Sequence, residues 1–264
     1  MSHVRAWPVT WLLAAALVAF WPVWDWYARR LDDGGGEPWG LFALIVAVSI
    51  VALRGTPGVV VPRSLIGPGL LAAVYIVGYG SLPPLLRGVV AFSVLAMLVS
   101  ATRAERSPDI GVWGLFMLAL PVVSTFQFLF AFPLRVAVGE IAAPLLQLAG
   151  LNVRAEGAVL LWGATQVVID APCSGIKMLW AGALLSFSMI ALTNMKPGAS
   201  IRLLVATIII VILVNVLRVS ALFYTETGIV DAPAFTHAAI GIVCFSIGSA
   251  GLLALAYRLD GHPS

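Results

Sequence analysis

The chain has 264 residues, of which 61% are hydrophobic and only 10% are charged. A soluble domain typically has about 25% charged residues, so this composition excludes an ordinary soluble protein and indicates a polytopic membrane protein. The formal charge of +3 does not indicate a nucleic-acid partner, because Lys and Arg in a membrane protein report its orientation first. Two cysteines outside any C-x-x-C motif exclude a disulfide framework.

Glycine and proline divide the chain into eight apolar segments that are candidate membrane-spanning helices, of which the second is short and the third is rich in glycine and closed by Pro83-Pro84. The predicted spans are 8–28, 39–54, 65–82, 86–102, 110–132, 174–193, 201–224 and 236–257. The first is interpreted as a retained span, because it is too long for the apolar core of a signal peptide and lacks a small-residue cleavage site. We therefore predict one all-α membrane domain covering residues 1–264.

Eight spans place both termini on the same side of the membrane, and that side has more basic residues. It carries Arg5, Arg54, Arg63, Arg103, Arg106, Lys196, Arg202 and Arg258, with the acids Glu105, Asp109 and Asp260; the other side carries Arg29, Arg30, Arg87, Arg135 and Arg154. The loop from Glu226 to Pro233 on that other side has acids and no base. The positive-inside rule predicts that the termini are cytoplasmic.

The segment 133–172 does not resemble a simple span and is predicted to be an insert outside the membrane. Gly139–Ala149 is amphipathic, and two apolar runs follow it, Val153–Trp162 and Ala164–Asp170, separated by Gly163. Runs of this kind joined at a glycine predict a small β-hairpin. A strand exposed to lipid would leave backbone groups unsatisfied, so the hairpin must lie on the protein or in water.

Cys173 follows this insert and is predicted to begin the sixth span, with Asp170 as N-cap and Pro172 in the first turn. The helix dipole and Lys177, one turn further on, would both favour the thiolate. A cysteine in an apolar chain is nevertheless more often a packing residue. Cys244, deeper in the last span, is interpreted in that way.

Arg218 and His237 are two further polar residues that are candidates for a functional role. Arg218 lies inside the seventh span, where a charge costs about 2.5–3.5 kcal/mol, and Asn215 shares its helix face. His237 opens the eighth span and could exchange a proton near neutral pH. An arginine snorkelling to the interface and a histidine acting as an ordinary polar anchor are the alternative interpretations.

Span direction brings these residues together. The sixth span leads away from Cys173, the seventh returns past Arg218, and the eighth leads away again from His237. All three side chains should therefore meet one face of the membrane, whichever way the protein is inserted. A cysteine activated by an adjacent histidine is a familiar nucleophile. One Cys and one His without further ligands do not build a metal site, and we predict no cofactor.

Three motifs carry a resemblance to a known family. They are Ala171-Pro172-Cys173-Ser174-Gly175-Ile176, Asn215-Val216-Leu217-Arg218, and His237 followed by Gly241. The chain resembles the exosortase/archaeosortase family of membrane-embedded cysteine transpeptidases, with a family-like core at about 65–258. Because the third motif has a histidine, His237, the chain resembles the bacterial exosortases more than the archaeosortases.

The resemblance implies roles for these residues: Cys173 as nucleophile, His237 as proton-transfer residue and Arg218 as stabiliser of the reacting carbonyl. The predicted supporting residues are Asn215, Lys177, Ser174, Gly175 and Asp170. The implied substrate is an exported protein whose C-terminal sorting signal, of the PEP-CTERM kind, has a short motif, a transmembrane helix and a basic tail. Cleavage would pass the new C-terminus to an envelope acceptor at the outer face of the bacterial inner membrane.

Two other functions are compatible with the sequence. A transporter or channel could use Arg218 and Lys177 to line an anion path. A structural or assembly factor of the cell envelope would need none of the three polar residues for its activity. The concentration of Cys, Arg and His at one level favours the enzyme over both.

Overall fold

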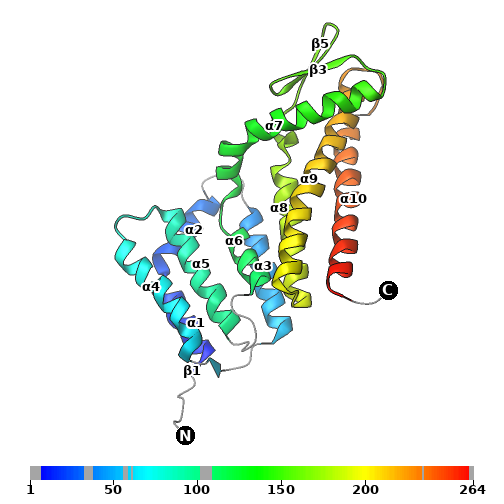
Figure 1. Ribbon diagram of the computed structural model, residues 1–264. Helices are drawn as coiled ribbons and strands as arrows, with labels where there is room; N and C mark the ends of the chain where they lie inside the picture. The colour runs from blue at the N-terminus through cyan, green and yellow to red at the C-terminus, as the bar shows by residue number, and fades with distance from the viewer. Residues whose placement is uncertain are drawn as a thin grey trace. The chain divides into compact units, whose positions relative to one another are not determined.

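The computed structural model describes residues 7–32, 38–55, 59–60, 62–101, 109–233 and 235–261, which are mostly α-helical (Figure 1). The predicted mostly helical fold is confirmed. Three of the basic residues used for the orientation, Arg5, Arg103 and Arg106, lie outside the described residues. The chain divides into two compact units, Met1–Val122 with Phe187–Ser200, and Val123–Ser186 with Ile201–Ser264.

Five of the described helices are long and apolar enough to cross a membrane. These are α5 (Pro84–Ala101), α7 (Val123–Leu148), α8 (Ile176–Thr193), α9 (Pro197–Glu226) and α10 (Thr236–Leu259). The helices α1 (Val9–Ala19) and α2 (Trp21–Asp32) form a pair bent by 65° that would make a sixth span. The apolar helices α3 (Pro38–Arg54) and α4 (Ile66–Gly78) are shorter. The count of eight spans remains a prediction.

The expected uninterrupted fifth span, 110–132, is wrong. Helix α6 (Ile110–Leu118) ends early, and α7 begins only at Val123. Pro121 explains the break, because it has no N–H to donate and disfavours helical geometry in the residue before it. Helix α7 then continues to Leu148, so Gly139–Ala149 is the last part of a long helix rather than a separate amphipathic piece.

The expected hairpin is instead a three-stranded antiparallel sheet with the order β3-β4-β5. Its strands are β3 (Val153–Glu156), β4 (Val159–Trp162) and β5 (Thr165–Val168). The run predicted as one strand turns at Gly157, whose φ is 61°, just as the next turn uses Gly163 with φ 58°. Glycine adopts such angles without steric penalty. The sheet packs on α7, which is one of the two positions that the sequence allowed, on the protein or in water.

In the first unit, α5 packs against α1, α2, α4 and α6, and α3 packs against α6. A short pair of strands, β1 (Trp7–Pro8) and β2 (Val59–Val60), and a 3₁₀ turn, η1 (Pro62–Leu65), complete it. Tyr27 of α2 donates a hydrogen bond of 2.8 Å from its hydroxyl to the carbonyl oxygen of Ala119. This bond uses a carbonyl that the end of α6 leaves unpaired within the helix.

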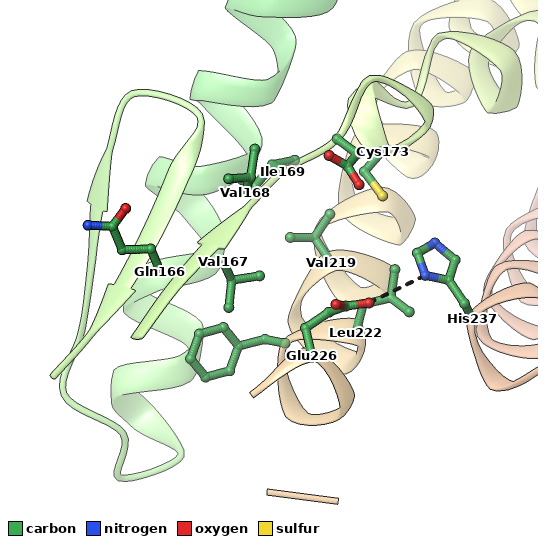
Figure 2. A pocket seen from close by; sticks show the side chains of 11 residues that line it. Gln166, Val167, Val168, Ile169, Cys173, Val219, Leu222, Glu226 and His237 are labelled. Carbon is green, nitrogen blue, oxygen red and sulfur yellow. Dashed lines mark ion pairs between the residues drawn. The ribbon is translucent and has the colours of Figure 1, made fainter. Parts of the chain in front are cut away.

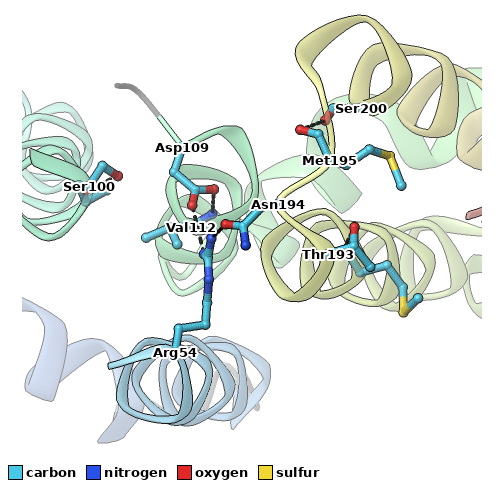
Figure 3. Close-up of polar contacts among 10 residues, drawn as sticks. Arg54, Ser100, Asp109, Val112, Thr193, Asn194, Met195 and Ser200 are labelled. Carbon is cyan, nitrogen blue, oxygen red and sulfur yellow. Dashed lines mark hydrogen bonds and ion pairs between the residues drawn. The ribbon is translucent and has the colours of Figure 1, made fainter. Parts of the chain in front are cut away.

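Three helix ends of this unit meet at a polar cluster (Figure 3). Arg54 at the end of α3 forms an ion pair of 2.7 Å with Asp109, and it also donates to Asn194 after α8. The Arg54 and Asp109 side chains are only 8% and 14% exposed. Asp109 in addition caps α6 by accepting from the Val112 N–H at 3.1 Å. Arg54 and Asp109, both predicted on the same side of the membrane, are thus in direct contact.

In the second unit, small residues let the helices approach closely. A Cβ added to Gly182 of α8 would lie 3.0 Å from Val211, and one added to Gly248 of α10 would lie 3.2 Å from Val214. The hydroxyls of Ser186 and Thr207 are hydrogen-bonded at 2.6 Å. Close backbone approach and interhelical hydrogen bonds are the usual means of helix association in a membrane. Helices α8, α9 and α10 run side by side in alternating directions (Figure 1).

A hydrophobic cluster joins α7, the sheet and the C-terminal part of α9. It contains Val138, Ala142, Ala143, Leu146, Val153, Leu160, Ile169, Cys173, Val216, Val219, Leu222 and Phe223. Leu160 and Val153, on the sheet face that meets α7, are fully buried. Cys173 belongs to this cluster, so its backbone is held between the sheet and α9.

Candidate active site

Cys173 lies in a short 3₁₀ turn, η2 (Ala171–Ser174), and not in the first turn of α8 as predicted. Gly175 follows with φ 81° and separates this turn from α8. Asp170 occupies the N-cap position of η2, but its side chain makes no capping hydrogen bond. The turn is closed by the backbone, with Cys173 N–H donating to the Asp170 carbonyl oxygen at 2.8 Å.

Asn215 of α9 anchors this turn. Its Nδ2 donates a hydrogen bond of 2.8 Å to the carbonyl oxygen of Cys173, and the residue is 1% exposed. A Cβ on Gly175 would lie 3.0 Å from that Nδ2 and 3.1 Å from the Asn215 Cγ. Gly175 is therefore required both for its positive φ and for the space that Asn215 occupies.

Arg218 is next to Asn215 on the same face of α9. Its Nη1 donates to the carbonyl oxygen of Pro172 at 3.3 Å. On the other side, a Cβ added to Gly241 of α10 would lie 3.4 Å from the Arg218 Nε, so the guanidinium packs against the backbone of α10 at this glycine. That Nε is buried and has no hydrogen-bond partner among the described residues. The guanidinium thus lies between the η2 turn and α10.

An open cavity of about 210 Å³ lies directly in front of Cys173 (Figure 2). Strand β5 and the residue after it form one wall, and α9 forms another with Val219, Leu222 and Phe223. His237, at the start of α10, and Glu226, at the end of α9, also line it. Cys173 and His237, which the sequence predicts at one level of the membrane, both line this cavity.

Glu226 is the residue that sequence reasoning missed. Its Oε1 lies 3.7 Å from the His237 Nδ1, and the two side chains are 54% and 45% exposed. Figure 2 shows them reaching toward each other, with the sulfur of Cys173 above them. Glu226 had counted only as an acid of an outer loop. Its position two residues after the predicted seventh span, 201–224, in the loop that leads to His237, was the available signal.

The electrostatics of Cys173 differ from the prediction. Burial raises the pKa of the Cys173 thiol, Arg218 lowers it, and the carboxylates of Asp170 and Glu226 raise it further. The net direction of the pKa shift is upward, which favours the thiol over the thiolate. Lys177 is not among the groups that shift this pKa, and Gly175, with φ 81°, separates Lys177 from the turn that holds Cys173. Lys177 is exposed and does not line the cavity.

Ser174, Asp170 and Cys244 differ in burial and in their relation to the cavity. Ser174 is buried in the η2 turn, 4% exposed, whereas Asp170 is exposed at the rim of the cavity. Cys244 lies deeper in α10 and is partly buried, away from the cavity lining. Among the described residues, no three His, Cys, Asp or Glu side chains gather as the ligands of a metal ion.

The fold and this cavity together define a helical membrane protein with a buried cysteine facing a histidine and a carboxylate. Residues 6–254 match the family model described as transmembrane exosortase (Exosortase_EpsH). The chain therefore belongs to the exosortase family, and the resemblance noted in its motifs is confirmed. The match includes the N-terminal segments before residue 65. Neither the curated proteins nor the solved structures contain a match.

Proposed function

We propose that this protein is a membrane cysteine peptidase and transpeptidase that cleaves the C-terminal sorting signal of exported proteins. The observation that carries the proposal is the shared cavity of Cys173, His237 and Glu226. A nucleophile, a base and a group that orients the base are the three parts of a covalent acyl-transfer site. Membership of the exosortase family supports the same reaction class.

In the first half-reaction, His237 takes the proton from the Cys173 sulfur as that sulfur attacks the peptide carbonyl carbon. His237 then gives this proton to the leaving amine, the C–N bond breaks, and a thioester on Cys173 remains. Glu226 would accept a hydrogen bond from the Nδ1–H of His237 once the two side chains approach, and this bond would direct the other ring nitrogen, Nε2, to the sulfur. The 3.7 Å separation would shorten as the imidazolium forms.

The raised pKa of the Cys173 thiol is compatible with this sequence of steps. A neutral thiol has little nucleophilicity, so the thiolate appears only when His237 accepts its proton beside bound substrate. Arg218 assists from behind the turn. Its positive charge opposes the effect of burial on the sulfur, and the same charge would stabilise the oxyanion of the tetrahedral intermediate.

In the second half-reaction, an acceptor nucleophile attacks the thioester and regenerates the Cys173 thiol. His237 removes the proton of the acceptor and returns it to the sulfur as the C–S bond breaks. An amine or hydroxyl of an envelope molecule completes transfer, whereas water completes hydrolysis. We place this chemistry at the outer face of a bacterial inner membrane, because the opposite face carries more basic residues.

The experiment is co-expression with a reporter protein ending in a sorting motif, an apolar helix and a basic tail. Cys173→Ala should abolish the shortening of the reporter, and Cys244→Ala, which removes the other cysteine, should leave it unchanged. Processing that persists in Cys173→Ala would exclude the mechanism. Neither Arg218 nor Lys177, the two residues of the alternative anion path, lines the cavity.

A further inference from the structure

Strand β5 is an edge strand that leads directly into the η2 turn with Cys173. The sheet order β3-β4-β5 leaves one side of β5 without a partner strand among the described residues. Such an edge presents a row of N–H and C=O groups that can pair with another extended chain. The short connection through Ile169 and Asp170 brings this edge beside the nucleophile (Figure 2).

The register identifies which backbone groups are available. Val167 pairs with Leu160, and Thr165 pairs with Trp162. Ile169 extends the same register, because its N–H donates to the Ala158 carbonyl oxygen at 2.9 Å. Hydrogen-bonded pairs alternate in an antiparallel ladder, so the N–H and C=O groups of Gln166 and Val168 point away from β4.

These two residues also line the cavity that contains Cys173 and His237. Val168 is 58% exposed, which is unusual for a β-branched apolar side chain in a strand. The cavity is therefore continuous with a strand edge that offers both backbone hydrogen bonds and an apolar contact. An extended polypeptide lying along this edge would reach the sulfur without further rearrangement of the chain.

We propose that the substrate segment beside the scissile bond binds as an added strand on the free edge of β5. This inference rests on the proposed function, and it identifies the binding mode of the substrate. The pairing is parallel, because both chains then have the same order: an extended segment outside the membrane, the reaction level, and a helix that enters the membrane. Backbone pairing supplies the affinity, while side-chain contacts in the cavity select the motif.

Proline substitution tests the backbone directly. Gln166→Pro and Val168→Pro each remove an N–H that points away from β4, and the ring blocks an added strand, yet the bonds to β4 remain. Gln166→Ala and Val168→Ala are the matched controls, because they change only the side chain. In the co-expression assay, we expect the proline variants to process the reporter at least about tenfold more slowly than the alanine variants. Equal processing by the two sets would overturn the proposal.

A cross-linking experiment gives a second readout that does not depend on activity. Val168→Cys is introduced into the Cys173→Ala, Cys244→Ala background, and the reporter carries single cysteines at successive positions of its motif. A paired strand should form disulfides at alternate positions, because successive side chains point to opposite faces. Uniform cross-linking, or none, would overturn the proposal even if the proline variants fail to fold.

The two proposals fail in different ways. Processing by Cys173→Ala would exclude the enzymatic mechanism itself. If Cys173→Ala is inactive while the proline variants process normally, only the strand pairing is wrong. If the β5 edge instead joins two copies of the chain, Val168→Cys will form a disulfide-linked dimer without the reporter, which also contradicts substrate pairing.

Discussion

Asn215 donates a hydrogen bond of 2.8 Å from its Nδ2 to the carbonyl oxygen of Cys173, across two elements that are distant in the sequence. Asn215 is 1% exposed, and this bond ties the η2 turn to the middle of a long apolar helix. The position of the sulfur therefore depends on a side chain that does not itself line the cavity.

Asn215→Ala should slow processing at least tenfold and lower the thermal stability in detergent. Losing a buried hydrogen bond and leaving its partner unsatisfied destabilises a protein by about 1–3 kcal/mol. The control is Leu217→Ala, which truncates an exposed residue of the same helix. Comparable losses in the two variants would show that α9 is sensitive to truncation in general, rather than at the turn that it anchors.

Gly175→Ala should impair processing for two reasons. The positive φ of 81° is unfavourable for alanine by about 1–2 kcal/mol. The new Cβ would also lie 3.0 Å from the Asn215 Nδ2 and push that side chain from the Cys173 carbonyl. Gly251→Ala in α10 is the matched control, since nothing lies within 4 Å of its position. Processing rates and melting temperatures of both variants check the prediction, and equal behaviour contradicts it.

Arg218→Met should raise the pKa of the Cys173 thiol further. The guanidinium stabilises the thiolate and so opposes the effect of burial, and removing it leaves burial unopposed. Since a maleimide or iodoacetamide reacts with the thiolate, the rate of Cys173 alkylation should rise with pH along a curve displaced to higher pH than in the parent protein. The measurement uses Cys244→Ala as background. A curve that does not move, or that moves to lower pH, would contradict the role of Arg218 in stabilising the Cys173 thiolate.

Glu226→Gln should slow processing roughly ten- to hundredfold, less than the loss of His237, whose acid–base role is worth about 10²–10⁴-fold. Glutamine keeps the size of the side chain but presents no charge to the imidazole, and Glu226→Asp should retain part of the rate. Asp231→Asn removes a nearby exposed acid and should have little effect. If both neutral variants slow the reaction equally, the general negative charge of this region matters and the Glu226–His237 contact does not.

A large part of the fold follows from the composition of the apolar segments. Helices α8, α9 and α10 could be predicted because long runs such as Ile201–Tyr224 have no stable conformation in lipid other than a helix. The positions at which helices end or continue through a proline, as in α6 and α7, were less predictable. Pro121 ends a helix while Pro133 and Pro144 lie within one, since neighbouring packing decides whether the lost hydrogen bond is tolerated. The sheet acquired a third strand because Gly157 makes a turn inside an apolar run.

The sequence predicts the level at which the polar residues meet. The alternating directions of three successive spans are expected to bring Cys173, Arg218 and His237 to one face of the membrane in either orientation. Only the folded structure gives the contacts that each side chain makes. In the structure, Arg218 donates a hydrogen bond to the Pro172 carbonyl oxygen, and Lys177 does not line the cavity. Glu226 and the edge strand β5 do line it. The reason is that level depends on chain direction and span length, whereas contact depends on turns such as Gly175 and on close packing between residues remote in the chain.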